Sequence, residues 1–394
     1  MIDRPQDQVC LDDALRRSRV VLMVGARQVG KTTLARRLAS DPANMFDLED
    51  PIDLARLANP MLALSELTGL VVIDEVQRAP DLFPVLRVLA DRPNLPAKFL
   101  LLGSASPTAL RQASESLTGR IETIELGGLR LSDVAHNKGA TVADRLWLRG
   151  GFPPAYLARD DKDAFVWLRQ YVRNLAQRDL PEFGLALPAA TLERFLGLVA
   201  HSHGQLWNSA APARTLGISE TTARKYVDVL ADALLIRVLP AWHENLGKRM
   251  IRSPKVYFRD SGLVHQLLGA TNHLALQRLP TMGATWEGWV VDLAIRTAGE
   301  EFSPHFWRTS NGAELDLLLV DGSRRVGVEV KRGDAPRLSP SMRAARTDLR
   351  LDHLFVIYPG QRRYQLDPDV TVLPVGSLTD DDWVSSGTDS SSSM

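Results

Sequence analysis

The feature that most constrains the chain is a glycine-containing loop near its N-terminus. Five apolar residues, 20–24, read as a strand that is buried on both faces. The sequence GARQVGKT follows over residues 25–32, and an amphipathic helix with Leu34 and Leu38 comes next. This order predicts a phosphate-binding loop, because backbone N–H groups of such a turn and of a helix N-terminus point toward anions. The alternative is a chance match in a glycine-containing loop. Such a match would also have to reproduce the strand before the loop, the helix after it and the Lys-Thr pair.

The loop residues have distinct expected roles in holding ATP. Lys31 is expected to reach the β- and γ-phosphates, and the Thr32 hydroxyl is expected to hold Mg²⁺. The expected nucleotide contacts are Gly25, Ala26, Arg27, Gln28, Val29, Gly30, Lys31, Thr32 and Thr33. The cofactors predicted from this loop are therefore ATP and Mg²⁺.

Two acids follow another apolar run, residues 70–73. Carboxylates at the C-terminal end of a buried parallel strand lie at the crevice where such sheets bind ligands. We expect Asp74 to contribute to the Mg²⁺ site, and Glu75 to act as the base that polarises the attacking water. The alternative is a pair of solvated loop acids.

Length and composition set wide limits. A chain of 394 residues predicts two or three domains. Lys plus Arg and Asp plus Glu both number 47, so only local patches can indicate a nucleic-acid partner. The single cysteine, Cys10, excludes a disulfide framework and a cysteine-based zinc site. We find neither a signal peptide nor an apolar run of membrane-spanning length, which predicts a cytoplasmic protein with no membrane partner.

Apolar, β-like runs recur along the first third of the chain. They lie at residues 45–48, 70–73, 99–102 and 121–126, with helical stretches between them. This alternation predicts a three-layer α/β domain over residues 1–135, a parallel sheet with helices on both faces. Ser104 follows the third run, where a small polar side chain can hydrogen-bond the γ-phosphate or the water.

Several segments together resemble a subfamily of prokaryotic AAA-type ATPases whose C-terminal domain has no assigned function. They are GARQVGKTT, VVIDEVQRAP, LLGSAS, SLTGRIETIEL, GGFPPAYLARDD and WLRQYVRNLAQRDLPEFG. The resemblance implies that one strand lies between the phosphate-loop strand and the Asp-Glu strand. It also implies that Ser104 is the residue called sensor one, and that residues 136–188 form a helical lid or connector.

The same resemblance gives Arg120 a role in a neighbouring subunit. In AAA+ proteins the end of the preceding helix presents an arginine finger to the neighbour's nucleotide, where it stabilises transition-state charge. Arg120 as a finger implies a ring or at least a dimer, so self-association is an expected partner interaction. The alternative is that Arg120 only pairs with the helix C-terminus.

Residues 189–275 read as a winged helix-turn-helix. A helix near residues 192–199, a short helix at 210–216 and a helix that starts at Glu220 after Ser219 give the helix-turn-helix pattern. The recognition helix would present four residues to the DNA major groove: Thr221, Thr222, Arg224 and Lys225.

Two β-like runs, 235–239 and 255–258, follow these helices. The segment between them predicts a wing that contacts DNA phosphates through Lys248, Arg249 and Arg252. The alternative is that a winged helix here serves dimerisation or packing.

Residues 276–380 read as a small α/β domain, and residues 381–394 as a disordered, serine-rich tail. A hairpin closed by Asp321-Gly322 brings Asp316 toward Glu329, and Lys331 shares a strand face with Glu329.

This arrangement resembles the PD-(D/E)XK nuclease core. The resemblance implies a second Mg²⁺ held by Asp316, Glu329 and the Val330 carbonyl, with Glu287 completing the shell and Lys331 positioning a water. The alternatives are charged residues on a solvated strand, and a domain of this fold that binds DNA without cleaving it.

The sequence thus predicts an AAA-type ATPase that uses ATP hydrolysis to bind and remodel DNA. One alternative is a metal-dependent DNA endonuclease gated by ATP. Another is a regulatory nucleotide switch that acts on protein partners.

Overall fold

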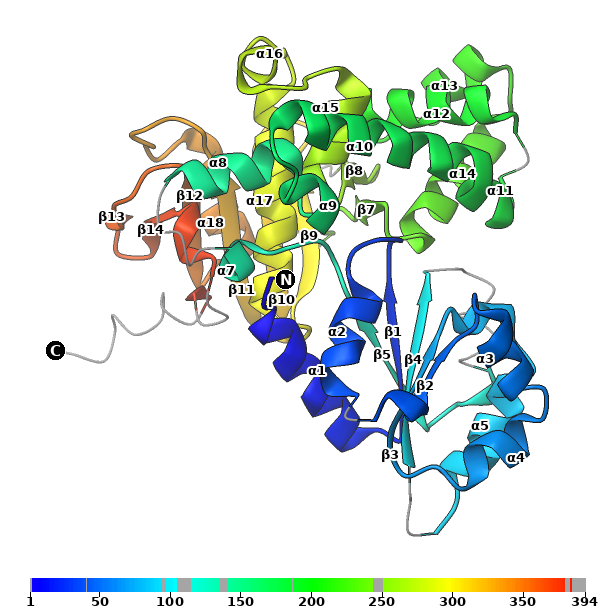
Figure 1. The fold of residues 1–394 in the computed structure, drawn as a ribbon. Coiled ribbons are helices and arrows are strands. Elements are labelled where there is room, and N and C mark those ends of the chain that lie inside the picture. Colours follow the sequence, from blue (N-terminus) through cyan, green and yellow to red (C-terminus); the bar gives the residue numbers. More distant parts are fainter. Residues whose placement is uncertain are drawn as a thin grey trace, which may run out of the picture. The chain divides into compact units, whose positions relative to one another are not determined.

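The computed structural model describes residues 2–39, 41–93, 97–104, 115–134, 140–185, 187–243, 251–379 and 383–384 (Figure 1). The chain divides into two compact units. The first comprises Met1–Leu129, Asp179–Ala186 and Tyr226–Leu235, and the second Arg130–Arg178, Leu187–Lys225 and Ile236–Met394. The predicted connector 136–188 is therefore shared between the units, because its last residues pack with the first one.

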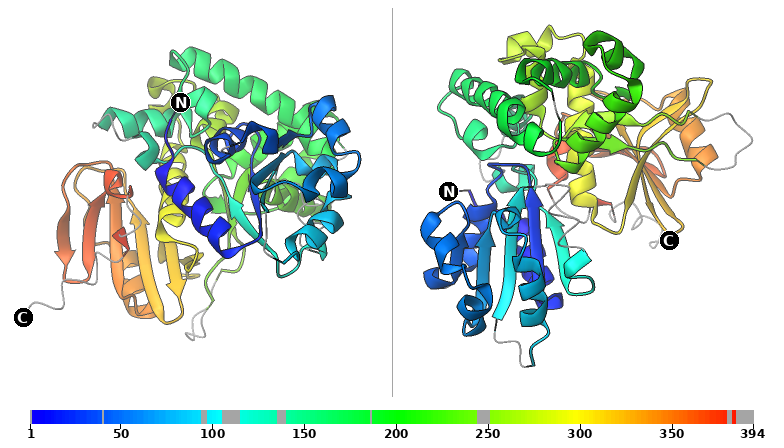
Figure 2. Two further views of the ribbon diagram at one scale, coloured as in Figure 1. Left: turned by 60° about the horizontal axis from the view of Figure 1, so that its bottom comes forward. Right: turned by 90° about the vertical axis from the view of Figure 1, so that its right-hand side faces the viewer.

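The first unit is built on a five-stranded parallel sheet. Its strands are β1 (Val20–Gly25), β2 (Met45–Asp47), β3 (Gly69–Asp74), β4 (Ala97–Ser104) and β5 (Ile121–Glu125), in the order β2-β3-β4-β1-β5. All six residues of β1 are buried, as expected for a central strand, and helices lie on both sides of the sheet (Figure 2). The predicted parallel sheet is confirmed, and so is the inserted strand, because β4 lies between β1 and β3.

The helices of this unit start at residues that suit helix N-termini. They are α1 (Pro5–Arg17), α2 (Lys31–Leu38), α3 (Pro51–Arg56), α4 (Pro60–Ser65), α5 (Leu82–Ala90) and α11 (Leu180–Glu182), with 3₁₀ turns η1 (Pro42–Asn44) and η2 (Val76–Arg78). Asp50 and Asn59 cap α3 and α4 through their side chains, and each is followed by a proline at the first helical position. The core between sheet and helices contains Phe46, Leu86 and Leu101.

Helices dominate the middle of the chain. They are α7 (Leu131–Val134), α8 (Ala140–Arg149), α9 (Pro153–Tyr156), α10 (Asp161–Asn174), the π-helical turn η3 (Leu175–Asp179), α12 (Ala189–His201), α13 (Ala210–Leu216), α14 (Glu220–Asp232), α15 (Ser261–Leu268) and α16 (His273–Gln277). A three-stranded antiparallel sheet accompanies them, with β6 (Gln205–Leu206), β7 (Ile236–Leu239) and β8 (Lys255–Phe258) in the order β6-β8-β7. Helix α14 begins in the second unit and ends in the first, and Leu234, two residues after the helix, packs against the core of the first unit.

A six-stranded mixed sheet and two helices form the C-terminal part. They are α17 (Met282–Ala298), β9 (Ser303–Arg308), β10 (Glu314–Asp321), β11 (Arg324–Val330), α18 (Pro340–Leu349), β12 (His353–Tyr358), β13 (Tyr364–Asp367), β14 (Val370–Pro374) and the turn η4 (Val375–Ser377). The strand order is β13-β14-β12-β11-β10-β9. Trp307, Leu318 and Val356 lie in the core of this sheet, against Met342 and Leu349 of α18.

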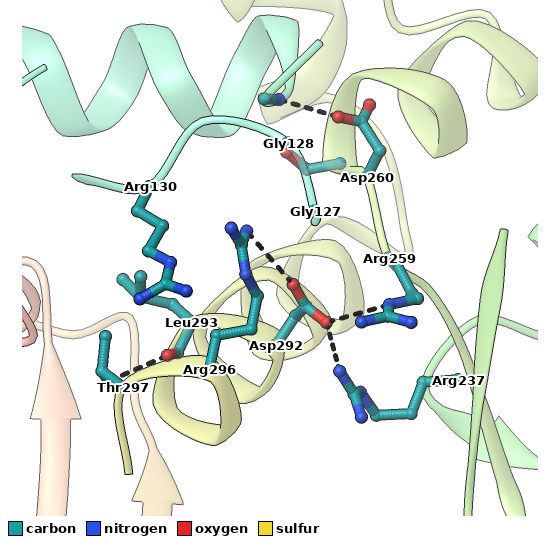
Figure 3. A network of polar contacts seen from close by, with 12 residues as sticks. Gly127, Gly128, Arg130, Arg237, Arg259, Asp260, Asp292, Leu293, Arg296 and Thr297 are labelled. Atoms are coloured by element: carbon teal, nitrogen blue, oxygen red, sulfur yellow. Dashed lines mark hydrogen bonds and ion pairs between the residues drawn. The ribbon is translucent and has the colours of Figure 1, made fainter. Parts of the chain in front are cut away.

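A buried acid with three arginines ties α17 to the strands that precede it (Figure 3). Asp292 accepts a hydrogen bond of 2.9 Å from Arg237, and the guanidinium groups of Arg259 and Arg296 lie 3.8 and 3.9 Å from its carboxylate. Burial alone would raise the pKa of Asp292, but the three arginines outweigh it and hold that pKa below its ordinary value. Asp292 is therefore an ionised, fully partnered side chain.

The disordered tail is predicted to begin at residue 381, but two residues shortly after this position are still packed against the domain. Trp383 and Val384 are buried, and the Trp383 indole donates a 3.0 Å hydrogen bond to the Thr297 hydroxyl. The indole also packs edge-on against Phe355, with 5.2 Å between ring centroids. An indole buries a large apolar surface, so Trp383 packs against the domain although most of its neighbours in the sequence are polar. Residues 385–394 lie outside the described part.

Across the described residues, no helix combines the length and the apolar character that crossing a membrane requires.

Candidate nucleotide site and carboxylate cluster

The phosphate-loop sequence lies between β1 and α2 and needs glycine at both of its ends. A Cβ atom on Gly25 would lie 2.4 Å from the Leu126 carbonyl oxygen, so a side chain there would push the two backbones apart. Gly30 has φ 103°, a left-handed conformation that side chains disfavour. Between them Val29 is buried, Ala26 and Arg27 are half-buried and Gln28 is exposed. Thr33, in the first turn of α2, is also exposed.

Lys31 points back along the loop. Its ammonium nitrogen donates to the carbonyl oxygens of Gly25 and Ala26, at 3.0 and 3.1 Å. Burial lowers the pKa of Lys31, although the charges of Glu75 and Asp74 act in the opposite direction. A cation held at the turn of a phosphate loop is placed to contact an anionic group that enters the loop.

Thr32 and Asp74 meet across the gap between α2 and β3. The Thr32 hydroxyl donates to the Asp74 carboxylate at 2.5 Å. Burial raises the pKa of Asp74, while the hydrogen bond from Thr32 lowers it. A hydroxyl and a carboxylate side by side are the hard oxygen donors that Mg²⁺ takes with phosphate ligands, so these residues fit the ion of Mg-ATP.

Glu75 has a strained backbone, with φ 54° and ψ 43°. Its carboxylate accepts a hydrogen bond from Gln77, which also donates to the Ser104 hydroxyl at 3.1 Å. Burial raises the pKa of Glu75, which makes it a better proton acceptor near neutral pH. The strand register that pairs Ser104 with Gly25 places this group of side chains beside the phosphate loop.

Three residues at or beside the loop were not identified by the sequence analysis. Gln77 is one, since it connects Glu75 with Ser104. Arg4 is the second, and its guanidinium donates to the carbonyl oxygens of Val29 and Gly127, at 3.0 and 2.8 Å. The third is Asp179, whose carboxylate lies 3.1 Å from the Arg27 guanidinium. Only Gln77 had a sequence signal, its position two residues after Glu75.

Arg120 is half-buried and bound within its own chain. Its guanidinium donates to the Asp91 carboxylate at 2.6 and 2.8 Å and to the Thr118 carbonyl oxygen at 3.0 Å. It precedes β5, and its carbonyl oxygen accepts from Val20 N at the start of β1. The phosphate loop follows the other end of β1, and six strand residues span about 20 Å. Arg120 thus lies too far away to contact the nucleotide of its own subunit.

Only some of the side chains that were predicted to contact DNA are exposed in the described structure. Thr221, Arg224 and Lys225 are exposed at the start of α14. Thr222 is different, because its hydroxyl lies 2.8 Å from the Ser219 hydroxyl, which also accepts from Thr222 N at 3.0 Å. Thr222 is therefore part of the helix cap, as its place three residues after Ser219 explains. In the predicted wing, Arg252 is exposed, whereas Lys248 and Arg249 lie outside the described residues.

The predicted nuclease-like residues lie together in the second unit. The register that pairs Leu317 with Val328 places Asp316 beside Glu329. Asp316 accepts a 2.8 Å hydrogen bond from Val330 N, and the Lys331 ammonium donates to Glu329 at 2.6 Å. Burial raises the pKa of Asp316 well above its usual value, and the nearby charges of Glu287 and Glu329 add to this.

A lysine that the sequence analysis did not identify lies among these acids. The Lys255 ammonium is 2.6 Å from Glu314, 3.0 Å from Glu287 and 4.0 Å from Asp316. Within the described ranges, no three acids, histidines or cysteines are arranged to hold a metal ion. Lys255 thus lies against two of the three predicted Mg²⁺ ligands, Glu287 and Asp316, and acids arranged around an internal cation do not fit a divalent ion.

Three family models match successive parts of the chain. Residues 17–135 match the family described as AAA domain. Residues 141–274 and 282–378 match two families described as domains of unknown function, DUF8612 and DUF4143.

Two mycobacterial proteins are similar over nearly the whole chain. They are uncharacterized protein Rv2008c of Mycobacterium tuberculosis (strain ATCC 25618 / H37Rv) and uncharacterized protein Mb2031c of Mycobacterium bovis (strain ATCC BAA-935 / AF2122/97). Each is 50% identical over 380 residues, which cover 96% of this chain and 85% of the relative. Among solved structures, the Walker-type ATPase PABY2304 of Pyrococcus abyssi is 15% identical with a TM-score of 0.45, over 68% of this chain and 96% of that one.

The parallel sheet, the phosphate loop and the family match together define an AAA-type phosphate-loop ATPase domain at the N-terminus. The chain as a whole belongs to the same family as the two mycobacterial proteins.

Proposed function

We propose that this protein couples ATP hydrolysis to binding and remodelling of DNA. The ATPase part rests on the site around Lys31, Asp74 and Glu75. Lys31 and the loop N–H groups bind the phosphates, and Thr32 and Asp74 would hold Mg²⁺, which neutralises phosphate charge when bound. Glu75 orients the attacking water and accepts its proton, and Gln77 and Ser104 keep the Glu75 carboxylate in place.

One observation carries the DNA part of the proposal. The element order α12-β6-α13-α14-β7-β8, with β6, β8 and β7 in one antiparallel sheet, supports the assignment of a winged helix. Its second helix of the turn, α14, starts with exposed Arg224 and Lys225, where a recognition helix contacts DNA. The chain continues from α14 to Leu234, which is partly buried against the core of the ATPase unit, and this continuity supports a mechanical connection between ATP turnover and DNA contact.

In the C-terminal domain, we propose a nuclease-like fold that serves DNA binding. The hairpin that carries Asp316 and Glu329, the parallel strands β11 and β12 and the flanking helix α17 support this assignment. The contact of Lys255 with the acids counts against an ATP-gated endonuclease.

DNA is expected to stimulate steady-state ATP hydrolysis. We would measure the rate at low salt with single-stranded, duplex, forked and four-way-junction DNA, and repeat it as salt rises, because phosphate contacts weaken steeply with salt. The double variant Arg224→Ala, Lys225→Ala should lose most of the stimulation and keep the basal rate. A matched control is Arg169→Ala, Arg173→Ala, which removes two exposed charges one turn apart from α10.

A flat response to all four DNAs at low salt would overturn the DNA-driven function and favour a nucleotide switch that acts on proteins. If the control variant Arg169→Ala, Arg173→Ala loses as much salt-sensitive stimulation as Arg224→Ala, Lys225→Ala, the loss is not specific to α14, and DNA binds elsewhere on the surface.

We further propose that Arg120 acts as a finger in the neighbouring subunit, since it cannot contact its own nucleotide. Arg120→Ala is expected to lower turnover by about 10³-fold, as the loss of such a finger does. Mixing it with Lys31→Ala should restore about a quarter of the wild-type rate, because one interface in four combines an intact loop with an intact finger. ATPase assays of each variant and of the mixture test this.

Asp91→Ala is the control for this experiment, because it removes the ion pair of Arg120 and leaves the finger intact. It should keep near wild-type turnover. Failure of the mixture to recover activity, or a loss in Asp91→Ala as large as that in Arg120→Ala, would make the role of Arg120 structural.

A further inference from the structure

We infer that Lys255 is a built-in cation that takes the place of a divalent metal ion in the acidic cluster of the C-terminal domain. The cluster consists of Glu287, Glu314, Asp316 and Glu329. With Lys255 in place, the domain keeps its acids without metal and does not cleave DNA by a metal-dependent route. This inference does not depend on whether DNA stimulates the ATPase.

Strand periodicity brings the lysine and the acids together. Lys255 and Tyr257 are two residues apart on β8, and Glu314 and Asp316 are two residues apart on β10, so each pair shares one face of its strand. Glu287 lies in α17, and its carboxylate accepts from both the Lys255 ammonium, at 3.0 Å, and the Tyr257 hydroxyl, at 2.6 Å. The contact therefore joins three elements far apart in sequence.

Lys255 is held as a charged group. Its side chain is only 3% exposed, yet three carboxylates lie within 4.0 Å of the ammonium nitrogen. Burial alone would lower the pKa of Lys255, but the acids raise it above the ordinary value. An ammonium group donates in three directions, which matches a site bounded by three acids.

The remaining charges are also paired within the domain. The second oxygen of Glu314 lies 3.3 Å from the Arg308 guanidinium, and Lys331 pairs with Glu329 at 2.6 Å. A metal ion that used Glu287 and Asp316 would lie within a few ångströms of the Lys255 ammonium, and two cations so close repel each other strongly in a buried site. The ion and the lysine are therefore alternatives.

One carboxylate oxygen of the cluster has no hydrogen-bond partner in the described structure, so it is the first candidate for a metal ligand. Glu329 Oε2 is buried and makes no hydrogen bond within the described structure. Burial raises the pKa of Glu329, which favours a proton at this oxygen when no cation contacts it. A direct metal titration decides between a proton and a metal ion at this position.

The test is Mn²⁺ binding to the full-length protein without nucleotide, followed by electron paramagnetic resonance and by thermal unfolding. Wild type should show no saturable Mn²⁺ site that depends on Asp316, and its Tm should not change with Mn²⁺. Lys255→Met should create such a site, and 1 mM Mn²⁺ should raise its Tm by about 5 °C, because the ion binds only the folded state.

A variant with fewer acids covers the case in which Lys255→Met folds poorly. Lys255→Met combined with Glu314→Gln and Asp316→Asn removes the uncompensated acids, and it should fold without gaining a Mn²⁺ site. Wild type that binds Mn²⁺ in a manner abolished by Asp316→Asn would overturn the inference. So would nicking of supercoiled plasmid by wild type in Mg²⁺ that Asp316→Asn removes. A failure of this inference can be told apart from a failure of the proposed DNA function, because Mn²⁺ binding requires neither DNA nor ATP.

Discussion

Glu75→Gln is expected to lower ATP turnover by about 10²–10⁴-fold, the usual contribution of a general base, while ATP binding stays near the wild-type level. The amide keeps the size of the side chain but cannot accept the proton of the attacking water. Binding is preserved because Lys31 and the loop N–H groups, rather than Glu75, contact the phosphates in the proposed site. Steady-state hydrolysis and the fluorescence of a labelled ATP analogue measure the two properties separately.

Lys31→Ala is the matching control, and it should lose binding as well as turnover. If Glu75→Gln lost ATP binding to the same degree, the assignment of Glu75 as the base would be wrong. Because burial raises the pKa of Glu75, wild-type turnover should fall as pH decreases through that raised pKa and the carboxylate takes up a proton. A rate that is independent of pH in this range would argue against the same assignment.

Asp292→Ala is expected to destabilise the second unit by about 3–5 kcal/mol, the typical cost of removing one partner from a buried ion pair. Three guanidinium groups, those of Arg237, Arg259 and Arg296, would lose their common anion. Urea unfolding followed by tryptophan fluorescence is the measurement. All eight tryptophans report on this unit alone: Trp147, Trp167, Trp207, Trp242, Trp286, Trp289, Trp307 and Trp383.

Asp292→Asn is the matched control, because it keeps the shape and one acceptor oxygen, and it should cost less than the alanine. The pH dependence has a definite sign. Since the folded-state pKa of Asp292 is depressed, its contribution to stability is complete above the unfolded value of about 3.9 and is lost as pH falls through the folded value. The difference between wild type and Asp292→Asn should therefore shrink in acid, and an undiminished difference would point to packing as the cause.

Much of the ATPase domain was predictable because its signals are local in sequence. The phosphate loop, the strand that ends in Asp74 and Glu75, and the strand that ends in Ser104 are short segments in which a buried run stops at polar residues. The inserted strand β4 followed from the resemblance to AAA-type ATPases, and the sheet order agrees.

The cluster in the C-terminal domain was only half predictable. Asp316, Glu329 and Lys331 follow from a hairpin and a strand period, and the structure does bring them together. Lys255 lies on a strand about sixty residues earlier, in a β-like run without a motif. Its contacts with Glu287 and Glu314 are the observation from which we infer that a lysine takes the place of the expected metal ion.

Local sequence patterns thus determined the phosphate loop, the position of Asp74 and Glu75 at a strand end, and the parallel sheet, since a strand period, a helix cap and a glycine turn act over a few residues. The tertiary structure alone decided which buried charges meet, as for Lys255 with Glu287, and which residue after the last strand, Trp383, joins the core. The physical reason is that a buried charge or indole is stabilised by whichever partner the folded chain brings within about 3–4 Å, and sequence separation carries no information about that partner.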